Sequence, residues 1–230
     1  MSIKSKTLLQ KIKRNKPYFE DFITRSVYNS NRIDGNTLSL PETYSIIFDN
    51  KNKMEVKTTE RERYEAINLK YAYSYILKNL DNNITVDMIK KVAKYINKNI
   101  KDIEGFRKTQ VFIKGASDIP PKSELVPMLV GELIYKKGKE KKEDIFDYVA
   151  RFHIEFEHIH PFEDGNGRTG RVFIAKELLS RGLAPVVIPY SKRDKYINCL
   201  DSRDVKNLSK MLKELNEEEL ERMMKFGIKL

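Results

Sequence analysis

The sequence of residues 145–171, IFDYVARFHIEFEHIHPFEDGNGRTGR, predicts two helices that meet at a short loop. In its first half, apolar side chains recur every three or four residues, which is the period of one face of an α-helix. These side chains belong to Ile145, Val149, Phe152, Phe156 and Ile159. Pro161 ends this helix because the residue before a proline is driven out of helical conformation. A second helix is predicted from about residue 167 to the Arg181–Gly182 pair.

The rest of the chain is also dominated by helix signals. Helices are expected in the first forty residues up to a turn at residues 33–36, over residues 60–80, from the side-chain cap Thr85, from Ser123, and from about Asp194 to the C-terminus. Residues 110–113 are the exception, since they are typical of a short strand that enters a turn. The sequence therefore predicts a mostly α-helical fold with one small hairpin.

The composition excludes two classes of protein. Cys199 is the single cysteine, which rules out an internal disulfide and favours a reducing compartment. No run approaches the roughly 18 apolar residues that a membrane-spanning helix needs. We therefore expect a soluble, cytoplasmic protein and neither a secreted disulfide scaffold nor a membrane protein.

The chain is strongly basic, because 44 Lys and Arg residues against 33 Asp and Glu residues give a net charge of +11. Such a charge can attract the phosphates of nucleic acids. The lysines, however, lie throughout the chain and not in one block, which favours a general bias of composition. Nucleic acid is therefore not expected to be the main partner.

The loop between the two helices has the chemistry of a phosphate site. A helix N-terminus presents unpaired backbone N–H groups and a partial positive charge, which suit an anion. Gly165 and Gly167 allow the backbone to approach a ligand closely and to form an anion-binding nest. Arg168 and Arg171 are three residues apart and so share a face of the second helix. Two guanidinium groups beside a nest favour a polyphosphate.

Two further side chains of this loop add reactivity. Asp164 can supply an oxygen ligand to Mg²⁺, which usually binds through one or two carboxylates together with substrate phosphates. His160 can take up a proton near neutral pH. Each residue alone has an ordinary interpretation, such as a histidine that caps a helix, an acid in a solvated turn or an arginine on an exposed face. Their combination within residues 160–171 favours a catalytic site.

The segment HPFEDGNGRTGR, residues 160–171, resembles the signature HPFx[DE]GNGRxxR of the Fic (Fido) family and matches it at every specified position. Residues 105–107 and the strand that follows resemble the family's flap hairpin, and residues 193–196 with Leu200 are similar to the helix after its motif. The resemblance covers about residues 25–205. It implies an all-α fold, a Fic-type helical bundle with a small β-hairpin flap, and transfer of AMP from ATP to a protein hydroxyl.

The resemblance also assigns roles to the loop. His160 would be the general base that deprotonates the target hydroxyl, and Asp164 would hold Mg²⁺ between the α- and β-phosphates of ATP. Gly165, Asn166 and Gly167 would cradle the phosphates. Attack at the α-phosphorus needs in-line positioning and charge stabilisation more than covalent help, which suits these residue types.

The resemblance implies four further contributions. Arg168 would grip the β-phosphate and Arg171 the γ-phosphate, while Phe162 would be a core anchor that sets the shape of the loop. Tyr196 is a candidate for stacking on the base of the nucleotide, with a place in the hydrophobic core as the alternative.

Val111, Phe112 and Ile113 form the predicted flap strand. The exposed edge of a strand can pair with an extended segment of a target protein and so present its hydroxyl. The alternative is that these side chains pack inward as ordinary core. Both can hold, because successive side chains of a strand point to opposite faces.

Residues 30–36, SNRIDGN, resemble the family's inhibitory motif [ST]xxxE[GN] and would place this chain in the subgroup with an N-terminal inhibitory helix. In that family the glutamate pairs with the second arginine of the motif, here Arg171, and blocks productive binding of the γ-phosphate. Asp34 stands at the glutamate position and is one methylene shorter. We expect Ser30 to bond the Asp34 carboxylate, and inhibition to persist in weaker form.

The resemblance divides the chain into two parts. Residues 1–45 would form an N-terminal helical region with the inhibitory motif, and residues 46–230 the core, with the flap near residues 107–119 and the catalytic loop at residues 160–171. The sequence leaves open the protein target, its Tyr, Thr or Ser acceptor, the use of ATP or another nucleotide, self-modification and a homodimer.

Competing functions have weaker signatures. His153, His158 and His160 are clustered, but the spacing HxxxEH differs from the HExxH and HxxEH of zinc hydrolases, and no P-loop GxxxxGK[ST] occurs. A phosphoryl-transferring relative would carry lysine in place of Gly167. Removal of AMP, with the inhibitory acid positioning water, and a basic helical protein that binds nucleic acid stay open as alternatives.

Overall fold

The computed structural model describes residues 3–48, 56–112, 119–137 and 144–229. Its helices are α1 (Ile3–Arg14), α2 (Lys16–Ile33), α3 (Leu40–Phe48), α4 (Glu60–Lys78), α5 (Val86–Ile96), α6 (Val126–Lys137), α7 (Ile145–Ile159), α8 (Asn166–Ser180), α9 (Arg193–Asp201) and α10 (Val205–Lys225). Two short 3₁₀ helices, η1 (Ser123–Leu125) and η2 (Tyr190–Lys192), precede α6 and α9. The predicted all-α fold is confirmed within these residues.

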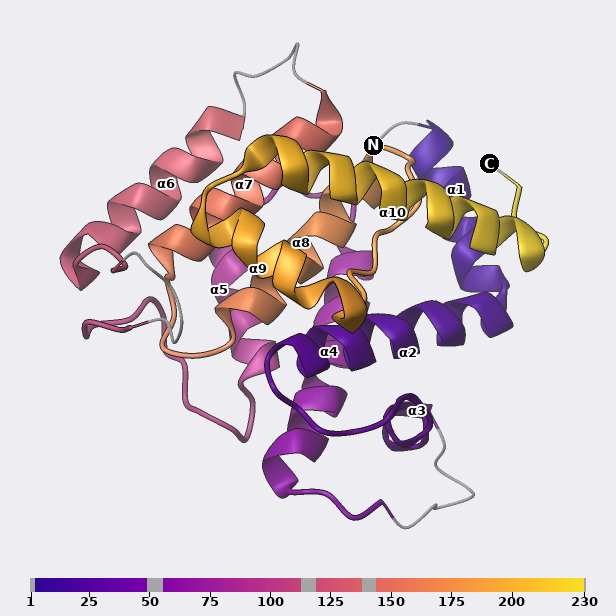
Figure 1. The fold of residues 1–230 in the computed structure, drawn as a ribbon, viewed down its shortest axis with the longest axis horizontal. Coiled ribbons are helices and arrows are strands. Elements are labelled where there is room, and N and C mark those ends of the chain that lie inside the picture. The colour runs from indigo at the N-terminus through magenta and orange to yellow at the C-terminus, as the bar shows by residue number, and fades with distance from the viewer. Residues whose placement is uncertain (1–2, 49–55, 113–118, 138–143, 230) are drawn as a thin grey trace.

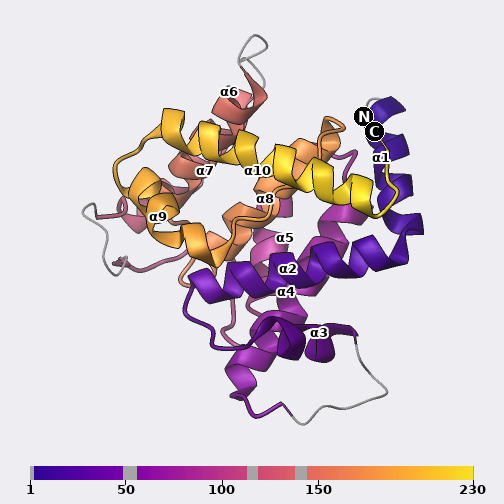
Figure 2. The ribbon, with the colours of Figure 1, turned by 45° about the vertical axis from the view of Figure 1, so that its right-hand side comes forward.

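Helix α8 is the centre of the bundle. Figures 1 and 2 show it between α10 above and α2 and α4 below, and it packs against α1, α2, α4, α5 and α7. Nearly every residue of α8 is buried, including polar ones. One cluster of buried apolar side chains runs from Leu8 to Ile228, so the N-terminal helices and the core share a single interior.

Local sequence sets the helix boundaries. The first forty residues contain a break that the prediction of a single helical region did not locate. The Asn15 side chain caps α2 by accepting a hydrogen bond from the Tyr18 N–H, and Pro17 follows in the first turn, where a proline costs no hydrogen bond. Thr85 caps α5 as predicted, and Thr59 with Glu62 forms a capping box at the start of α4.

The predicted flap strand is absent from the described residues. Gln110, Val111 and Phe112 belong to no strand, whereas Ile113 lies outside the described residues. The two arms of this segment are joined by the Gln110 side chain, which donates to the carbonyl of Pro120 at 2.8 Å. A ladder is disfavoured here because a proline lacks the N–H group that a ladder needs, and an isolated two-stranded hairpin is marginal in water.

No helix in the described ranges is both long and apolar enough to cross a membrane.

A buried cluster of polar side chains joins α2 to α10. The carboxylate of Glu219 accepts a hydrogen bond from the Tyr18 hydroxyl at 2.7 Å and from both terminal nitrogens of Arg25 at 2.7 and 2.8 Å. Burial and the neighbouring Glu219 raise the pKa of Tyr18. The tyrosine therefore stays a neutral donor, and Glu219 is the one acceptor that its hydroxyl and Arg25 share.

We expect Glu219→Gln to lower the free energy of unfolding by about 2–3 kcal/mol, because it leaves a largely buried guanidinium with fewer acidic partners. Glu218→Gln is the matched control, since the Glu218 side chain is 63% exposed and pairs with Lys192 at the surface. The control should change stability by less than about 1 kcal/mol. Urea unfolding followed by circular dichroism measures both, and equal effects of the two variants would contradict the assignment.

Candidate active site

The loop between α7 and α8 begins at His160, whose backbone is left-handed with φ 47°. This conformation is uncommon for a residue with a side chain and stops the helix abruptly. Arg107 stabilises the turn from outside, because its Nε donates to the carbonyl of His160 at 2.8 Å and its backbone N–H donates to Pro161 at 2.9 Å. The same guanidinium also donates to carbonyls of Thr109 and Pro121. Arg107 therefore fixes His160 relative to the segment predicted as a flap.

Phe162 and Asn166 set the shape of the loop. The Phe162 side chain is fully buried against Phe106, with ring centroids 5.7 Å apart. The Asn166 side chain accepts from the Phe162 N–H at 2.9 Å and donates to the Phe162 carbonyl at 2.8 Å. The prediction that Phe162 is a core anchor is confirmed. The Asn166 side chain thus holds the loop, and its part in the phosphate cradle stays a prediction.

Glycine is needed in the loop for both conformation and space. Gly165 has φ 77°, and a Cβ atom there would lie 2.9 Å from the side chains of Ile96 and Asn97. A Cβ at Gly170 would lie 2.6 Å from His153 and Glu157. Because Gly165 has no side chain, α8 starts without a side-chain cap, and its first N–H groups are available to an anion.

A pocket of about 640 Å³ opens in front of this loop. Several predicted site residues line it together, namely Asp34, Phe112, His160, Asp164, Gly165, Asn166, Gly167, Arg168, Arg171 and Tyr196. Ser30, Val111 and Phe162 are not among its lining residues. The pocket is therefore formed by both the predicted catalytic loop and the predicted inhibitory motif.

His160 is poised to accept a proton. Its Nδ1 lies 3.2 Å from the carbonyl of Glu157, and since a carbonyl only accepts, Nδ1 carries the proton. The Nε2 atom then keeps its lone pair. Burial lowers the pKa of His160 to about 4. The imidazole is therefore neutral at physiological pH, as a general base requires.

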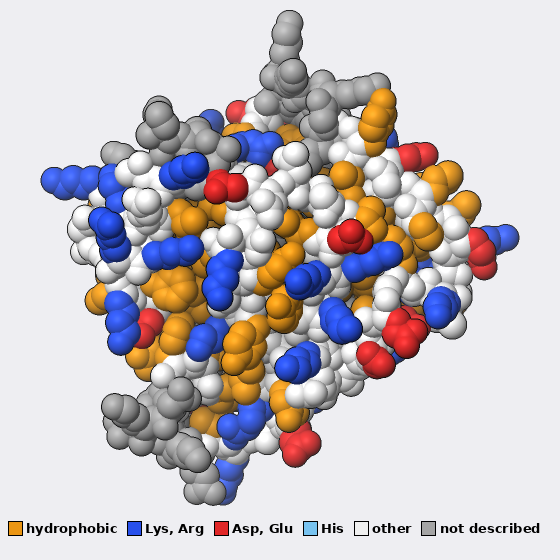
Figure 3. Space-filling view, turned by 180° about the vertical axis from the view of Figure 1, so that it is seen from behind, with side chains coloured by type: hydrophobic (Ala, Val, Ile, Leu, Met, Phe, Trp, Pro, Cys, Tyr) orange, Lys and Arg blue, Asp and Glu red, His pale blue; other side chains and the backbone are white. Residues whose placement is uncertain are grey.

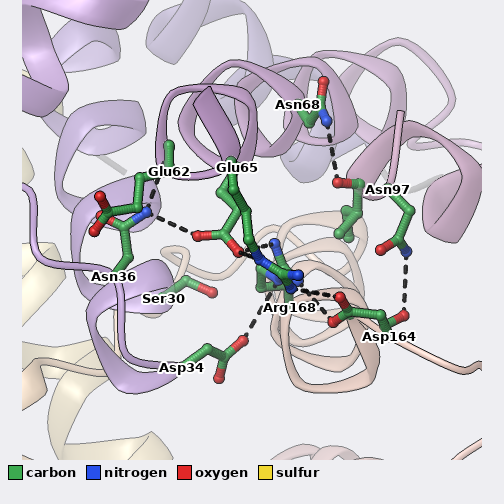
Figure 4. A network of polar contacts seen from close by, with 12 residues as sticks. Ser30, Asp34, Asn36, Glu62, Glu65, Asn68, Asn97, Asp164 and Arg168 are labelled. Carbon is green, nitrogen blue, oxygen red and sulfur yellow. Dashed lines mark hydrogen bonds and ion pairs between the residues drawn. The ribbon is translucent and has the colours of Figure 1, made fainter. Parts of the chain in front are cut away.

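Arg168 and Asp164 belong to a ring of charges with two residues of α4 that the sequence reasoning missed (Figure 4). Asp164 accepts from Arg168 at 3.0 Å through one carboxylate oxygen and from Arg61 at 2.6 Å through the other. Glu65 closes the ring with ion pairs to Arg61 at 3.1 Å and to Arg168 at 3.5 Å. Although burial opposes it, the attraction of Arg168 and Arg61 lowers the pKa of Asp164.

Arg168 retains unused hydrogen-bonding capacity. Its side chain is only 3% exposed, and its Nε and Nη1 atoms make no hydrogen bond to any described residue although carboxylates lie 3.5 Å away. Buried donors in native proteins normally find a partner. An anionic ligand in the pocket is the partner that these two donors fit best.

Arg171 is held by the predicted inhibitory motif. Its Nη2 donates to the Asp34 carboxylate at 2.8 Å and to the Ser30 carbonyl at 2.9 Å, and its Nε donates to the Ser30 hydroxyl at 2.8 Å. The shorter side chain of Asp34 thus reaches the arginine. The prediction that Ser30 bonds the Asp34 carboxylate is wrong, since both residues bind the same guanidinium instead.

Tyr196 lies in the core directly beneath the pocket, whose lining it joins. Its side chain is fully buried, its hydroxyl lies 2.6 Å from Nε2 of His153, and its ring stacks on that histidine. The burial of Tyr196 favours the alternative of a place in the hydrophobic core, and stacking on a base stays a prediction. Burial raises the pKa of the neighbouring Glu157 to about 8 and lowers that of His153 to about 3.

The three histidines do not form a metal site. His153 bonds Tyr196, His158 lies 2.8 Å from the Leu200 carbonyl, and His160 faces the pocket. Among the described residues, no group of three or more His, Cys, Asp and Glu side chains could hold a metal ion. The zinc-hydrolase alternative therefore has no geometric support in this part of the chain.

Comparison with known proteins agrees with this geometry. Residues 83–178, which include α5, α7 and the loop, match the model of the Fic/DOC family. The "Protein adenylyltransferase Fic" of Culex quinquefasciatus is 34% identical over 184 residues, which is 76% of this chain and 35% of that protein. The corresponding protein of Drosophila melanogaster is 32% identical over 180 residues. The chain thus spans about a third of the length of these relatives.

Solved structures agree on the fold. A Fic domain-containing signaling protein from Bacteroides thetaiotaomicron superposes with a TM-score of 0.81 at 19% identity and covers 99% of both chains. Fic-1 from C. elegans, residues 134–508, superposes with a TM-score of 0.78 at 22% identity, over 98% of this chain and 66% of that one. Together with the motif at residues 160–171 and the relatives above, these matches show that the chain belongs to the Fic/DOC family.

Proposed function

We propose that this protein transfers AMP from ATP to a hydroxyl side chain of a target protein and releases pyrophosphate. The observation that carries the proposal is a neutral histidine, with Nε2 free to accept a proton, in one pocket with the uncapped N-terminus of α8 and two arginines. This set of groups matches an attack on phosphorus assisted by a general base. The relatives named as protein adenylyltransferases support the same reaction.

In the proposed reaction, Nε2 of His160 accepts the proton of the target hydroxyl while the oxygen of that hydroxyl attacks the α-phosphorus of ATP. A P–O bond to the AMP group forms and the bond to pyrophosphate breaks. The N–H groups at the start of α8 and the free donors of Arg168 stabilise the charge on the phosphate oxygens. Arg171 would bind the terminal phosphate once Asp34 has left it.

Asp164 is the residue that we propose as the Mg²⁺ ligand. One carboxylate is enough when phosphates supply further oxygens, and Asp164 is ionised and lines the pocket. Bound Mg²⁺ would neutralise charge on the phosphates. Arg61, which now occupies one of the two Asp164 oxygens, would then have to release it.

We further propose that Asp34 inhibits the transfer. The ion pair with Arg171 at 2.8 Å occupies the guanidinium that the terminal phosphate would bind, and Asp34 places a negative charge 3.5 Å from Nε of Arg168. Asp34 therefore opposes nucleotide binding in two ways. Its charge repels the phosphates, and its side chain occupies the place of the terminal phosphate at Arg171. Since the aspartate reaches Arg171, inhibition should be as effective as with glutamate and not weaker.

The target would bind beside Val111 and Phe112. Phe112 is 77% exposed and lines the pocket, so an extended target segment can pack on it next to His160. The acceptor, a Tyr, Thr or Ser hydroxyl, would then be selected by its position beside His160. The residues that flank it in the target would need no specific pockets.

The transfer is tested by incubating the protein with Mg²⁺, cell extract and ATP labelled on either the α- or the γ-phosphate. We expect label from the α-phosphate to enter protein, and His160→Ala to lower the rate by about 10²–10⁴-fold, the usual contribution of a general base. The melting temperature of the variant serves as control for folding. Label from the γ-phosphate would instead indicate a phosphoryl transferase, and an unchanged rate in His160→Ala would contradict the role of the histidine.

Inhibition is tested with Asp34→Asn, which keeps the shape of the side chain and removes its charge. We expect ATP affinity to rise about tenfold, since a partly buried ion pair contributes on the order of 1–2 kcal/mol. Asp34→Glu is the matched control and should bind ATP as weakly as the natural protein. Isothermal titration calorimetry measures all three proteins. Equal affinities of the natural protein and Asp34→Asn would exclude an inhibitory role.

The protonation state of His160 can be read by NMR, because the chain has only three histidines. With its pKa lowered to about 4 by burial, the His160 imidazole should stay neutral as the pH falls from 8 to about 5. Its resonance is assigned by its loss in His160→Ala. A midpoint near the ordinary value of about 6.5 would show that the imidazole is solvated.

A further inference from the structure

A second concave surface lies beside the active site. Helix α5 and residues 97–105 border a groove of about 940 Å³, which is larger than the pocket in front of His160. In Figures 1 and 2, α5 lies behind α8, on the side of the molecule that Figure 3 turns to the viewer. Figure 3 shows basic side chains spread among apolar ones over the middle of that face. None of the proposed catalytic or inhibitory residues lines this groove.

The groove carries an excess of positive charge. Five lysines line it, Lys90, Lys91, Lys94, Lys98 and Lys101, against the three acids Asp87, Asp102 and Glu104. Among the ion pairs between described residues, Lys101 takes part in one with Glu163, and the other four lysines take part in none. Lys90 and Lys94 are four residues apart on α5, so their like charges face each other along the helix and destabilise it. Lys98 follows in the turn after the helix. An acidic ligand would remove this repulsion.

Apolar surface lies between the charges. Tyr95, Ile100 and Ile103 line the groove. The ammonium group of Lys90 lies 4.7 Å from the centre of the Phe106 ring. A groove with apolar side chains and a basic rim fits a polypeptide that carries both acidic and apolar residues. The apolar side chains between the charges favour such a polypeptide over the continuous phosphate backbone of a nucleic acid.

The wall of the groove contacts the catalytic loop. Lys101 pairs with Glu163 at 2.8 Å, and Glu163 lines the pocket together with His160. The Asn97 side chain donates to the carbonyl of Asp164 at 3.1 Å. From Gly105, the chain runs on through Arg107 to Phe112 at the pocket mouth. A polypeptide seated in the groove can therefore extend past Glu163 and bring a hydroxyl toward His160.

We propose that the groove along α5 is a docking site for an acidic, apolar segment of the protein that is modified. The inference rests on the proposed transfer of AMP to a protein, because it gives that protein a second contact away from the reacting hydroxyl. Recognition of a segment away from the acceptor, through its charge, would select the target protein without constraining the sequence around the acceptor.

Docking is tested by binding alone, so that its result does not depend on catalysis. The probe is a fluorescein-labelled twelve-residue peptide of Glu and Leu, followed by fluorescence anisotropy without nucleotide. Lys94→Glu/Lys98→Glu reverses two groove charges four residues apart. Lys206→Glu/Lys210→Glu makes the same change at the same spacing on exposed positions of α10 and is the matched control. Melting curves confirm that both variants fold.

We expect the groove variant to bind the peptide at least about tenfold more weakly, and the control to change binding less than about twofold; tenfold corresponds to about 1.4 kcal/mol. Equal weakening in both variants would show attraction by net charge alone and overturn the proposal. A single-stranded oligonucleotide that binds more tightly than the peptide, and is lost in the groove variant, would overturn it in favour of nucleic acid. If the peptide binds as expected but no AMP is transferred, the proposed function fails and the docking surface stands.

Discussion

The buried guanidinium of Arg171 is the group on which the arrangement of the site depends. It lies on α8, is only 6% exposed, and is held by Ser30 and Asp34 at the end of α2. A charge at such depth needs acidic and polar partners. These partners fix the end of α2 against the start of α8, beside the loop that carries His160. The same contact therefore links the end of α2 to the pocket.

Much of this could be predicted from the sequence, because it depends on local signals. The period of three to four residues located α7, Pro161 ended it, and two glycines marked the loop before α8. The motif at residues 160–171 then indicated which side chains meet in the pocket. The reach of Asp34 could not be predicted, because it depends on how closely α2 approaches α8. That distance is set by packing along the whole of both helices.

Other parts of the site gave no local signal. Arg61 and Glu65 are four residues apart on one helix, a spacing that by itself indicates no site. In the structure they contact Asp164 and Arg168, about a hundred residues later in the chain. Arg107 was seen only as part of a flap, although it binds the backbone at His160. The strand predicted around Val111 did not form within the described residues. A strand there would need a partner whose N–H groups complete the ladder, and Pro120 and Pro121 have no N–H group.

The charges of the pocket link the proposed inhibitory contact of Asp34 to the stability of the protein. Arg168 and Arg171 are both nearly buried, and their acids come from three places: Asp34 on one side, Glu65 on another, and Asp164 in the loop itself. A polyphosphate would replace Asp34 at Arg171 and offer negative charge to Arg168. The acids thus neutralise the same guanidinium groups that a bound nucleotide would neutralise. A variant that lacks the Asp34 charge should therefore bind nucleotide more readily and, for the same reason, depend more on nucleotide for its stability.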